Sequence, residues 1–364
     1  MSKRILLIEP YYGGSHKQFL DGMIKHIPAD FTLWSLPARK WKMRMQLAAP
    51  WFAGQLRQMD PGNRWFDTVC FSTFIDVALF KALVQKIDGW NDRCRYLTYF
   101  HENQFEYPGL LPKQTLHQFT AINFASALVS DSIAFNSHFN RNSFLNHVGT
   151  YLAKAADIDI RYVLEELEEK SLVLYPGIDF TDQNLIKKKD RSDGDSPLII
   201  WNHRWEHDKN PEEFFSALID LEDRGISFRL ALLGQRFRDK PHCFTSGLEK
   251  LADRIIHTGF LEDRQDYYRL LAEGDVIVST ARHEFFGIAV IEAVRAGCTP
   301  VLPDRLSYPE LFEKKYLYQD GCLSSHLQQV LQKRDVLPVK QRERLTRSFS
   351  WEKLSADYEK WLGI

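Results

Sequence analysis

Short apolar runs alternate with helix-like segments along this chain, and the alternation constrains the fold more than any other feature. In the first half, strand-like runs occupy residues 4–9, 31–35, 68–71, 95–100, 132–135 and 172–175. Helical patterns lie between most of them, notably at residues 75–87 and 113–129, and Ser15 is predicted to cap a helix that extends to about residue 27. Near-continuous apolar strands between helices predict an α/β fold with a parallel sheet covered on both faces.

The alternation stops at residues 181–197, which read TDQNLIKKKDRSDGDSP and show neither a helical nor a strand period. A charged stretch with Gly and Pro is typical of a linker between domains. Beyond it, strand-like runs return at residues 198–202, 228–233, 255–257, 276–279 and 299–302, with helical patterns at 211–224, from 263, and at 287–296. We therefore expect two Rossmann-like domains that face each other across a cleft, with ligands beyond the carboxyl ends of the strands.

These boundaries define the expected domains. An N-terminal domain covers residues 1–180, the linker covers residues 181–197, and a C-terminal domain covers residues 198–349. The last amphipathic segment, residues 350–364, is expected to form a helix that begins after Ser350 and packs back on the N-terminal domain. The length of 364 residues agrees with two domains of roughly 150 residues each.

The charge balance excludes a binder that relies on bulk positive charge. Lys and Arg number 47 against 48 Asp and Glu, so the formal net charge is -1, although local basic surfaces remain compatible with it. Five scattered cysteines without a C-x-x-C pair argue against a disulfide framework or a thiolate zinc site. No apolar run approaches the roughly 18 to 20 residues that span a bilayer, and the N-terminal run is too short for a signal peptide. We expect a cytoplasmic protein without a membrane segment.

Polar or glycine-rich loops follow four of the predicted strands. The first, YYGGSHK, places Gly13 and Gly14 before a helix, where they either allow the backbone to approach a ligand or serve only as turn residues. It lacks the G-x-G-x-x-G spacing of a dinucleotide site. The second loop, HENQ, begins with His101, which can donate a hydrogen bond to a substrate hydroxyl. Four polar side chains at a strand end are costly to bury without a purpose, which favours a functional role.

The third loop, WNHRWEHDKNP, brings two cations to the start of a predicted helix. Arg204 and Lys209 precede that helix, and Asn210 is expected to cap it. Fixed cations beside a helix N-terminus suit a diphosphate. His203 and His207 are four residues apart, which also suggests a metal pair, but the loop lacks the H-E-x-x-H order. A zinc site is therefore disfavoured.

The fourth loop carries the strongest signal, because Glu284 and Glu292 are separated by seven residues with Gly287 between them. In one continuous helix, eight steps would place them roughly 12 Å apart along the axis. The two carboxyl groups of a glycoside hydrolase are about 5 to 9.5 Å apart, so two separate ligand contacts fit better than a hydrolase pair. Amide groups near Phe286 and Gly287 would face a phosphate at the helix N-terminus. Solvent-exposed helix charges are the alternative interpretation.

Taken together, these segments resemble a known family. The spacing from Glu284 to Glu292 resembles the E-x7-E motif of retaining GT-B glycosyltransferases of family 4, and Arg204 and Lys209 resemble their paired Arg and Lys. Six blocks spread over most of the chain are similar to the tRNA-queuosine α-mannosyltransferase family: YYGGSHKQFL, LPARKW, YFHENQFEYP, FNSHFNRNSF, HRWEHDKNPEEFF and ARHEFFGIAVIEAV. The resemblance implies a GT-B architecture, GDP-mannose as the donor and queuosine in a tRNA anticodon as the acceptor.

The resemblance also implies roles for the donor-binding residues. Glu284 would hold the mannose hydroxyls and Glu292 the nucleotide ribose. Arg204 and Lys209 would stabilise the leaving diphosphate, in place of a metal ion. The expected reaction retains the anomeric configuration, with the departing phosphate accepting the acceptor's proton, so electrostatic stabilisation is the main catalytic effect. No metal and no other cofactor is expected.

Three further positions receive implied roles near the transferred sugar. His101 would line the donor sugar beside the anomeric carbon. Gly13 and Gly14 would let the first loop approach the donor phosphate or the acceptor. Two other readings stay open at this point, namely a GT-B transferase with a different donor and a small-molecule, lipid or glycan acceptor, and a GT-B-like binding protein without activity. The sequence does not specify an oligomeric state.

A chain that is nearly neutral must contact tRNA through local basic clusters. In the first candidate, Arg39, Lys40, Lys42 and Arg44 surround Trp41, which can stack on a base extruded from the anticodon loop. The two further candidates are residues 187–189 and the group Arg236, Arg238 and Lys240. For each cluster the alternative is an ordinary solvated face, which we favour for residues 187–189.

Overall fold

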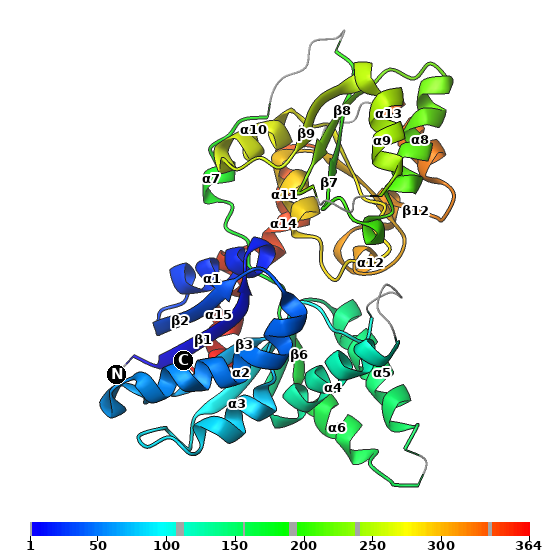
Figure 1. The fold of residues 1–364 in the computed structure, drawn as a ribbon. Coiled ribbons are helices and arrows are strands. Elements are labelled where there is room, and N and C mark those ends of the chain that lie inside the picture. The colour runs from blue at the N-terminus through cyan, green and yellow to red at the C-terminus, as the bar shows by residue number, and fades with distance from the viewer. Residues whose placement is uncertain (1, 107–112, 156, 189–194, 237–240, 334–336) are drawn as a thin grey trace. The chain divides into compact units, whose positions relative to one another are not determined.

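Two α/β units make up the part of the chain that the structure describes. A computed structural model describes residues 2–106, 113–155, 157–188, 195–236, 241–333 and 337–364. Within these segments, the strands form two six-stranded parallel sheets (Figure 1). One unit consists of Met1–Ile178 with Trp351–Ile364, and the other consists of Asp179–Ser350. The α/β class predicted from the alternation is confirmed.

The sheet of the first unit has the strand order β2-β1-β3-β4-β5-β6. Its strands are β1 (Arg4–Tyr12), β2 (Asp30–Pro37), β3 (Thr68–Ser72), β4 (Arg95–Phe100), β5 (Ser132–Phe135) and β6 (Ser171–Val173). Successive side chains of a strand point to opposite faces. Accordingly, Ile5 and Leu7 of β1 enter one hydrophobic core, and Leu6 and Ile8 enter another on the opposite face.

Helices cover both faces of this sheet (Figure 1). Helices α1 (Gly14–His26) and α15 (Trp351–Leu362) supply one core, and α2 (Trp41–Gln58) and α3 (Val77–Val84) supply the other. The remaining helices of the unit are α4 (Lys113–Val129), α5 (His138–Leu152) and α6 (Tyr162–Glu169). The helix cap predicted at Ser15 is wrong. Because β1 continues to Tyr12, α1 begins at once, and Gly13 occupies the cap position without a side-chain hydrogen bond.

The sheet of the second unit has the strand order β12-β11-β10-β7-β8-β9. Its strands are β7 (Leu198–Asn202), β8 (Arg229–Leu233), β9 (Ile255–Gly259), β10 (Val276–Val278), β11 (Thr299–Pro303) and β12 (Leu317–Tyr318). Helices α8 (Pro211–Asp223), α9 (Cys243–Lys250) and α13 (Leu323–Lys333) pack into the main core of this unit. Helices α10 (Arg264–Glu273) and α11 (Ile288–Ala296) lie on the other side of the sheet (Figure 1). The short α12 (Tyr308–Leu311) and α14 (Val339–Thr346) complete the unit.

The polar segment at residues 181–197 begins with structure rather than with a plain linker. Helix α7 (Thr181–Asn184) lies in the second unit, whose first residue is Asp179. Gln183 is buried, and its side-chain amide donates a 2.5 Å hydrogen bond to the carbonyl of Glu292. The expectation of no helical structure in this segment is therefore wrong for its first four residues. Residues 189–194 lie outside the described residues.

Each sheet has one position where the strand order reverses. In the first unit the chain adds β2 on one side of β1 and β3 on the other, and in the second it adds β8 and β10 on opposite sides of β7. Loops that leave two such neighbouring strands diverge at their carboxyl ends, where open α/β sheets bind their ligands. The ends of β1 and β3, and those of β7 and β10, are therefore the places to search for a site.

Two expectations about the chain's environment can be compared with the structure. The five cysteines all lie in described segments and are unpaired, and only Cys322 is exposed. No helix within the described segments is long and apolar enough to cross a membrane.

Candidate active site

Hydrogen bonds join the loops that follow β7 and β10 in the second unit. The carbonyl of Asp208 accepts the backbone N–H groups of Arg282 and His283, at 2.8 and 3.2 Å. The hydroxyl of Thr280 donates to the carbonyl of Lys209 at 2.8 Å. Because of these bonds, the loop with the predicted diphosphate cations and the loop with Glu284 form one structure at the strand-order reversal.

Lys209 is the central cation of this structure. It ends a 3₁₀ turn (His207–Lys209) and is only 7% exposed. Its Nζ lies 3.3 Å from a carboxylate oxygen of Glu284 and 3.3 Å from one of Asp208, and it donates a 2.6 Å hydrogen bond to the carbonyl of His283. A buried ammonium is costly unless it is paired in this way. The structure therefore brings Lys209 and Glu284 together, and it adds Asp208, which the sequence analysis missed.

Charge and burial fix the protonation states around Lys209. Burial by itself would raise the pKa of Glu284, but the opposite charge of Lys209 outweighs it and lowers that pKa. Burial and, second, the charge of Lys209 lower the pKa of His203 to about 4, so this imidazole is neutral at pH 7. Its Nε2 is buried and has no hydrogen-bond partner among the described residues. His203 can therefore offer a ring nitrogen to a ligand.

Gly287 separates Glu284 from helix α11. It has a left-handed φ of 99°, and a Cβ there would lie 3.2 Å from the ring of Tyr308, so glycine suits both the turn and the space. Glu284 thus precedes the helix, as expected. Phe286 is buried, and its carbonyl accepts a 3.1 Å hydrogen bond from the hydroxyl of Ser307. Because α11 begins at Ile288, amides without an intrahelical acceptor start just beyond the two positions that we predicted for phosphate contact.

Glu292 has partners of its own. It is buried within α11, and one carboxylate oxygen accepts a 2.8 Å hydrogen bond from the hydroxyl of Tyr267. That hydroxyl in turn accepts a 2.9 Å hydrogen bond from the amide of Asn202, at the end of β7. Arg264 approaches the other oxygen to 3.6 Å. Glu284 and Glu292 therefore have different protein partners, and their two separate ligand contacts stay a prediction.

Arg204 lies in the same loop as Lys209 but is more exposed. Its guanidinium is 3.0 Å from a carboxylate oxygen of Glu206. Asn210 occupies the cap position of α8 as predicted, but it has a left-handed φ of 50° and its side chain bonds Glu213 instead of the helix amides. Pro211, whose fixed φ suits a first helical position, starts α8 without a side-chain capping bond.

The two histidines of that loop have different surroundings. His207 is 3.9 Å from Glu212, whereas His203 is buried, and burial together with the charges of Lys209 and Arg204 lowers its pKa. In the described segments, the group of three His, Cys, Asp or Glu side chains that converges most closely lies in the other unit. The absence of zinc from this loop stays a prediction.

His101 is held by three rings in the first unit. It is buried at the end of β4, with ring centroids of His16, Tyr99 and Phe19 at 4.0, 4.7 and 4.9 Å. Its backbone carbonyl accepts a 2.7 Å hydrogen bond from the side-chain amide of Asn136. The pKa of His101 is well below its usual value, first because of burial and second because of the charge of His16. A neutral imidazole is thus available to a ligand.

Gly13 and Gly14 each occupy a position where the local backbone structure itself favours glycine. A Cβ on Gly13 would lie 2.5 Å from that of Ala38, so only glycine allows this close approach of the loops after β1 and β2. Gly14 has a left-handed φ of 53° at the first position of α1. Their contact with a donor or acceptor stays a prediction.

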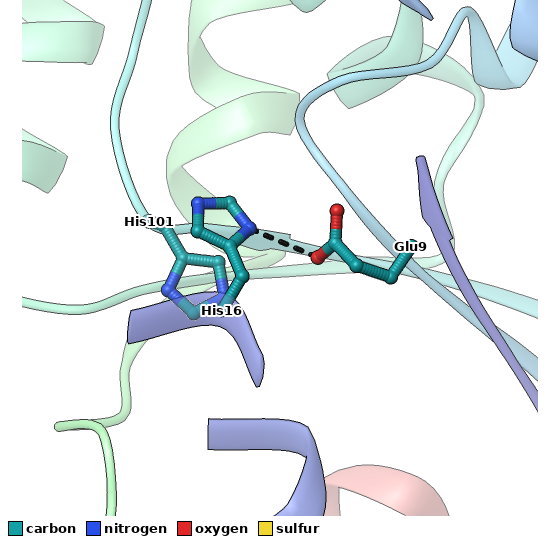
Figure 2. Close-up of side chains that lie close together, drawn as sticks. All are labelled: Glu9, His16 and His101. Atoms are coloured by element: carbon teal, nitrogen blue, oxygen red, sulfur yellow. Dashed lines mark hydrogen bonds and ion pairs between the residues drawn. The ribbon is translucent and has the colours of Figure 1, made fainter. Parts of the chain in front are cut away.

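Three side chains, which we call the His16 array, lie close together at the carboxyl ends of β1 and β4, and Figure 2 shows two of them, Glu9 and His16, beside His101. The members of the array are Glu9, His16 and Glu102. The Nδ1 of His16 is 2.9 Å from Glu9, and the Nε2 is 3.4 Å from Glu102. The HENQ loop that contains Glu102 stood out in the sequence, whereas Glu9 and the role of His16 did not, because Ser72 and Glu102, with which they interact, are distant in the sequence.

The predicted basic segment lies at the start of α2. Arg39, Lys40 and Lys42 are exposed, and Arg44 is half-buried. Lys42 places its Nζ 5.7 Å from the ring of Trp41, which is half-buried against two other aromatic rings. Those rings are Phe74 and Phe119, and Phe74 also lies 5.3 Å from the ring of His16. Aromatic contacts therefore connect the basic segment to the His16 array.

The other two basic clusters are less suited to bind tRNA. Lys188 donates a hydrogen bond to the carbonyl of Gly274. Arg236 bonds Thr258 and lies 4.6 Å from the ring centroid of Trp205. Lys189, Arg238 and Lys240 lie outside the described residues.

Comparison with known proteins decides the family. A curated protein of Drosophila melanogaster, tRNA-queuosine alpha-mannosyltransferase, is 36% identical over 360 residues, which are 97% of this chain and 93% of that protein. The chain belongs to the tRNA-queuosine α-mannosyltransferase family. The family profile for the N-terminal part of tRNA-queuosine alpha-mannosyltransferase matches residues 4–178, and that of the group 1 glycosyl transferases matches residues 182–345. As a member of this family, the chain is a glycosyltransferase.

Three further proteins share less sequence identity or less of their length with this member of the tRNA-queuosine α-mannosyltransferase family. A GDP-mannose-dependent alpha-(1-6)-phosphatidylinositol dimannoside mannosyltransferase of Mycobacterium tuberculosis is 32% identical over 111 residues, 30% of this chain and 28% of that protein. The catalytic domain of starch synthase IV from Arabidopsis thaliana, bound to ADP and acarbose, has a TM-score of 0.73 at 12% identity, over 100% and 99% of the two chains. Anabaena Alr3699/HepE, in complex with UDP and glucose, has a TM-score of 0.68 at 14% identity, over 100% of both. The predicted GT-B class is confirmed.

Proposed function

We propose that this glycosyltransferase moves mannose from GDP-mannose to queuosine in the anticodon of a tRNA, with retention of the anomeric configuration and without a divalent metal. The similarity to the Drosophila tRNA-queuosine α-mannosyltransferase, which extends over 97% of this chain, carries the proposal. The profile match over residues 4–178 supports a shared acceptor, because it covers the unit that does not contain Lys209 and Glu284.

The second unit is suited to a nucleotide sugar. Lys209 and Arg204 would bind the diphosphate, and the amides at Phe286 and Gly287 would lie near one of its phosphates. Glu284 would bind the mannose hydroxyls, and Glu292 would bind the ribose. Guanine is the preferred base, since the partly matching mannosyltransferase of Mycobacterium tuberculosis is GDP-mannose-dependent.

Lys209 would supply the main catalytic effect. As the bond to the anomeric carbon breaks, negative charge grows on the diphosphate, and a preorganised buried cation stabilises that charge most where water is excluded. Asp208 and the carbonyl of His283 hold the ammonium in place before the donor binds. The departing phosphate would accept the acceptor's proton on the same face. With a cation already built into the loop, no metal ion is needed for the leaving group.

Transfer to tRNA is the direct test of this proposal. Purified protein is incubated with labelled GDP-mannose and either queuosine-containing tRNA or the same tRNA without queuosine. We expect label in the first tRNA alone, unchanged by EDTA. Equal incorporation into both tRNAs would refute the acceptor, and activity that EDTA abolishes and Mn²⁺ restores would refute metal independence. Labelled UDP-glucose serves as the donor control.

The basic segment is the proposed tRNA surface. Phosphate contacts through Arg39, Lys40, Lys42 and Arg44 would guide the anticodon loop toward the neighbouring His16 array, with Trp41 available to a base on its exposed side. No contribution of a membrane is proposed.

We expect that Lys40→Gln, Lys42→Gln and Arg44→Gln together weaken tRNA binding and lower its salt dependence. Each lost phosphate contact reduces the slope of log affinity against log salt by about 0.7 to 0.9. Filter binding at several salt concentrations measures the slope, and donor hydrolysis should stay intact. A matched variant neutralises three exposed basic residues elsewhere in the same unit: Lys86, Arg93 and Lys154. Equal slopes for the two triple variants would contradict a specific role for the basic segment.

A further inference from the structure

The His16 array occupies the strand-order reversal of the first unit. Ile8 of β1 pairs with Phe71 of β3, so Glu9 and Ser72 are the next residues along these two strands. One oxygen of Glu9 accepts hydrogen bonds from the hydroxyl of Ser72 at 2.9 Å and from the N–H of Tyr11 at 2.8 Å. The other oxygen faces His16. Glu9 is therefore fixed on both sides at the edge where this kind of sheet binds ligands.

His16 is held between two carboxylates. Its side chain is 7% exposed, and Glu9 and Glu102 approach its two nitrogens to 2.9 and 3.4 Å. The hydroxyl of Thr73 donates a 3.0 Å hydrogen bond to the other oxygen of Glu102, so the second carboxylate is also oriented. Both nitrogens of a ring that faces two acceptors act as donors only when the ring is protonated. The geometry therefore favours an imidazolium.

The arrangement of the rings is not that of a metal site. Glu9, His16 and His101 place one potential ligand atom each within 4.8 Å of one another. However, the ring centroids of His16 and His101 are 4.0 Å apart at an angle of 35°, so the rings face each other rather than a shared point (Figure 2). Both nitrogens of His16 are also occupied by carboxylates.

We propose that the His16 array is a positioning group that fixes the neutral ring of His101 for contact with the donor sugar. His16 would press against one face of His101, while Tyr99 and Phe19 hold it from β4 and α1. This role rests on the proposed function and on the place beside the anomeric carbon that the family resemblance implies for His101. The array would act through His101 and would not itself touch the sugar.

Protonation states support this role. Burial lowers the pKa of His16, but the charge of Glu9 and the hydrogen bonds to Glu102 and Glu9 outweigh it and raise that pKa to about 10. Among the described residues, the titratable and charged groups that face His101 are His16 from α1, Tyr99 from β4 and Glu9 from β1, whose carboxylate lies within 4.8 Å of a His101 nitrogen, besides Glu102 next to it in the chain. A charged His16 beside the buried His101 disfavours protonation of the neutral His101 ring and so lowers its pKa. Loss of the His16 charge should therefore raise the pKa of His101.

Two variants and one control test the array. Glu9→Gln keeps the oxygen that accepts from Tyr11 and Ser72 but removes the charge beside His16. His16→Gln removes the charged ring. The control is Glu106→Gln, which alters the more exposed pair of Glu106 and His147, 3.6 Å apart in the same unit.

Two measurements give the outcome. Histidine-selective NMR of the whole protein should show that His16 stays protonated above pH 8 in the wild type. The pKa of His16 should be lower in Glu9→Gln, and the pKa of His101 should be higher in His16→Gln. In the tRNA assay, kcat of His16→Gln should fall by about 10- to 100-fold with little change in the donor KM. The loss should deepen at acid pH, while Glu106→Gln stays like the wild type.

An ordinary pKa for His16 in the wild type, or a pH profile of His16→Gln that matches Glu106→Gln, would overturn the inference. Failure of the proposed function has a different signature, because the wild type would then transfer no mannose while the NMR titrations still report on the array. Thermal unfolding of each variant separates a loss of positioning from a loss of fold.

Discussion

We expect Lys209→Met to lower kcat for mannose transfer by about 100- to 1,000-fold, the cost of removing one preorganised group that stabilises a developing negative charge. Methionine preserves most of the apolar stem but removes the ammonium that lies 3.3 Å from both Glu284 and Asp208. The leaving diphosphate would then meet these two carboxylates without their cation. Initial rates at saturating donor and tRNA measure the effect.

The same substitution at an exposed lysine of the same unit, Lys250→Met, provides the control. It should leave kcat within a factor of two or so of the wild type, as expected for a surface change away from a site. Circular dichroism of both variants verifies that they are folded. A folded Lys209→Met protein with the turnover of Lys250→Met would refute the role of Lys209 at the diphosphate.

The second large effect is on stability, and it comes from Trp351. Its indole is 1% exposed, stacks on His26 and contacts the rings of Phe19 and Tyr358. The indole packs directly against Gly22, and a Cβ at that position would collide with it. Trp351→Ala should cost about 3 to 5 kcal/mol of unfolding free energy, the usual range for a buried Trp or Phe. Urea denaturation followed by circular dichroism measures it.

Trp65→Ala is the matched control, since Trp65 belongs to the same unit but is 52% exposed. The loss there should be much smaller, because little apolar surface returns to water. If the two variants unfold at the same urea concentration, α15 does not stabilise the first unit in the way that its burial indicates.

Much of the fold could be predicted from the sequence because its strands are continuous apolar runs. β4, β5 and β7 begin and end at the predicted residues. Helix α2 was not predicted, because Pro50 and several polar residues weaken its helical signal. The cap predicted at Ser15 followed from residue type alone, although the cap position depends on where β1 ends. The ends of helices cannot be predicted from sequence where tertiary structure, rather than local preference, determines them.

The candidate site was predictable residue by residue but not as an arrangement. Glu284 and Lys209 each stood out by type and motif, yet their ion pair depends on β7 lying next to β10, which is set by topology. The same holds for Glu9 and His16, whose link to Glu102 needs β1 and β4 to share one sheet edge. A sequence shows which side chains are chemically apt, whereas strand order determines which of them meet.

Helix α15 also has a consequence for the synthesis of the chain. Domains generally fold in the order in which the ribosome releases them. Here, Phe19 and Met23 belong to a core that is closed by Trp351 and Tyr358. All of Asp179–Ser350 is translated before these last residues emerge. The first unit is thus synthesised first but can complete its core only after the second unit has been translated. A premature stop codon in the second unit would therefore also destabilise the first unit, because it would remove α15.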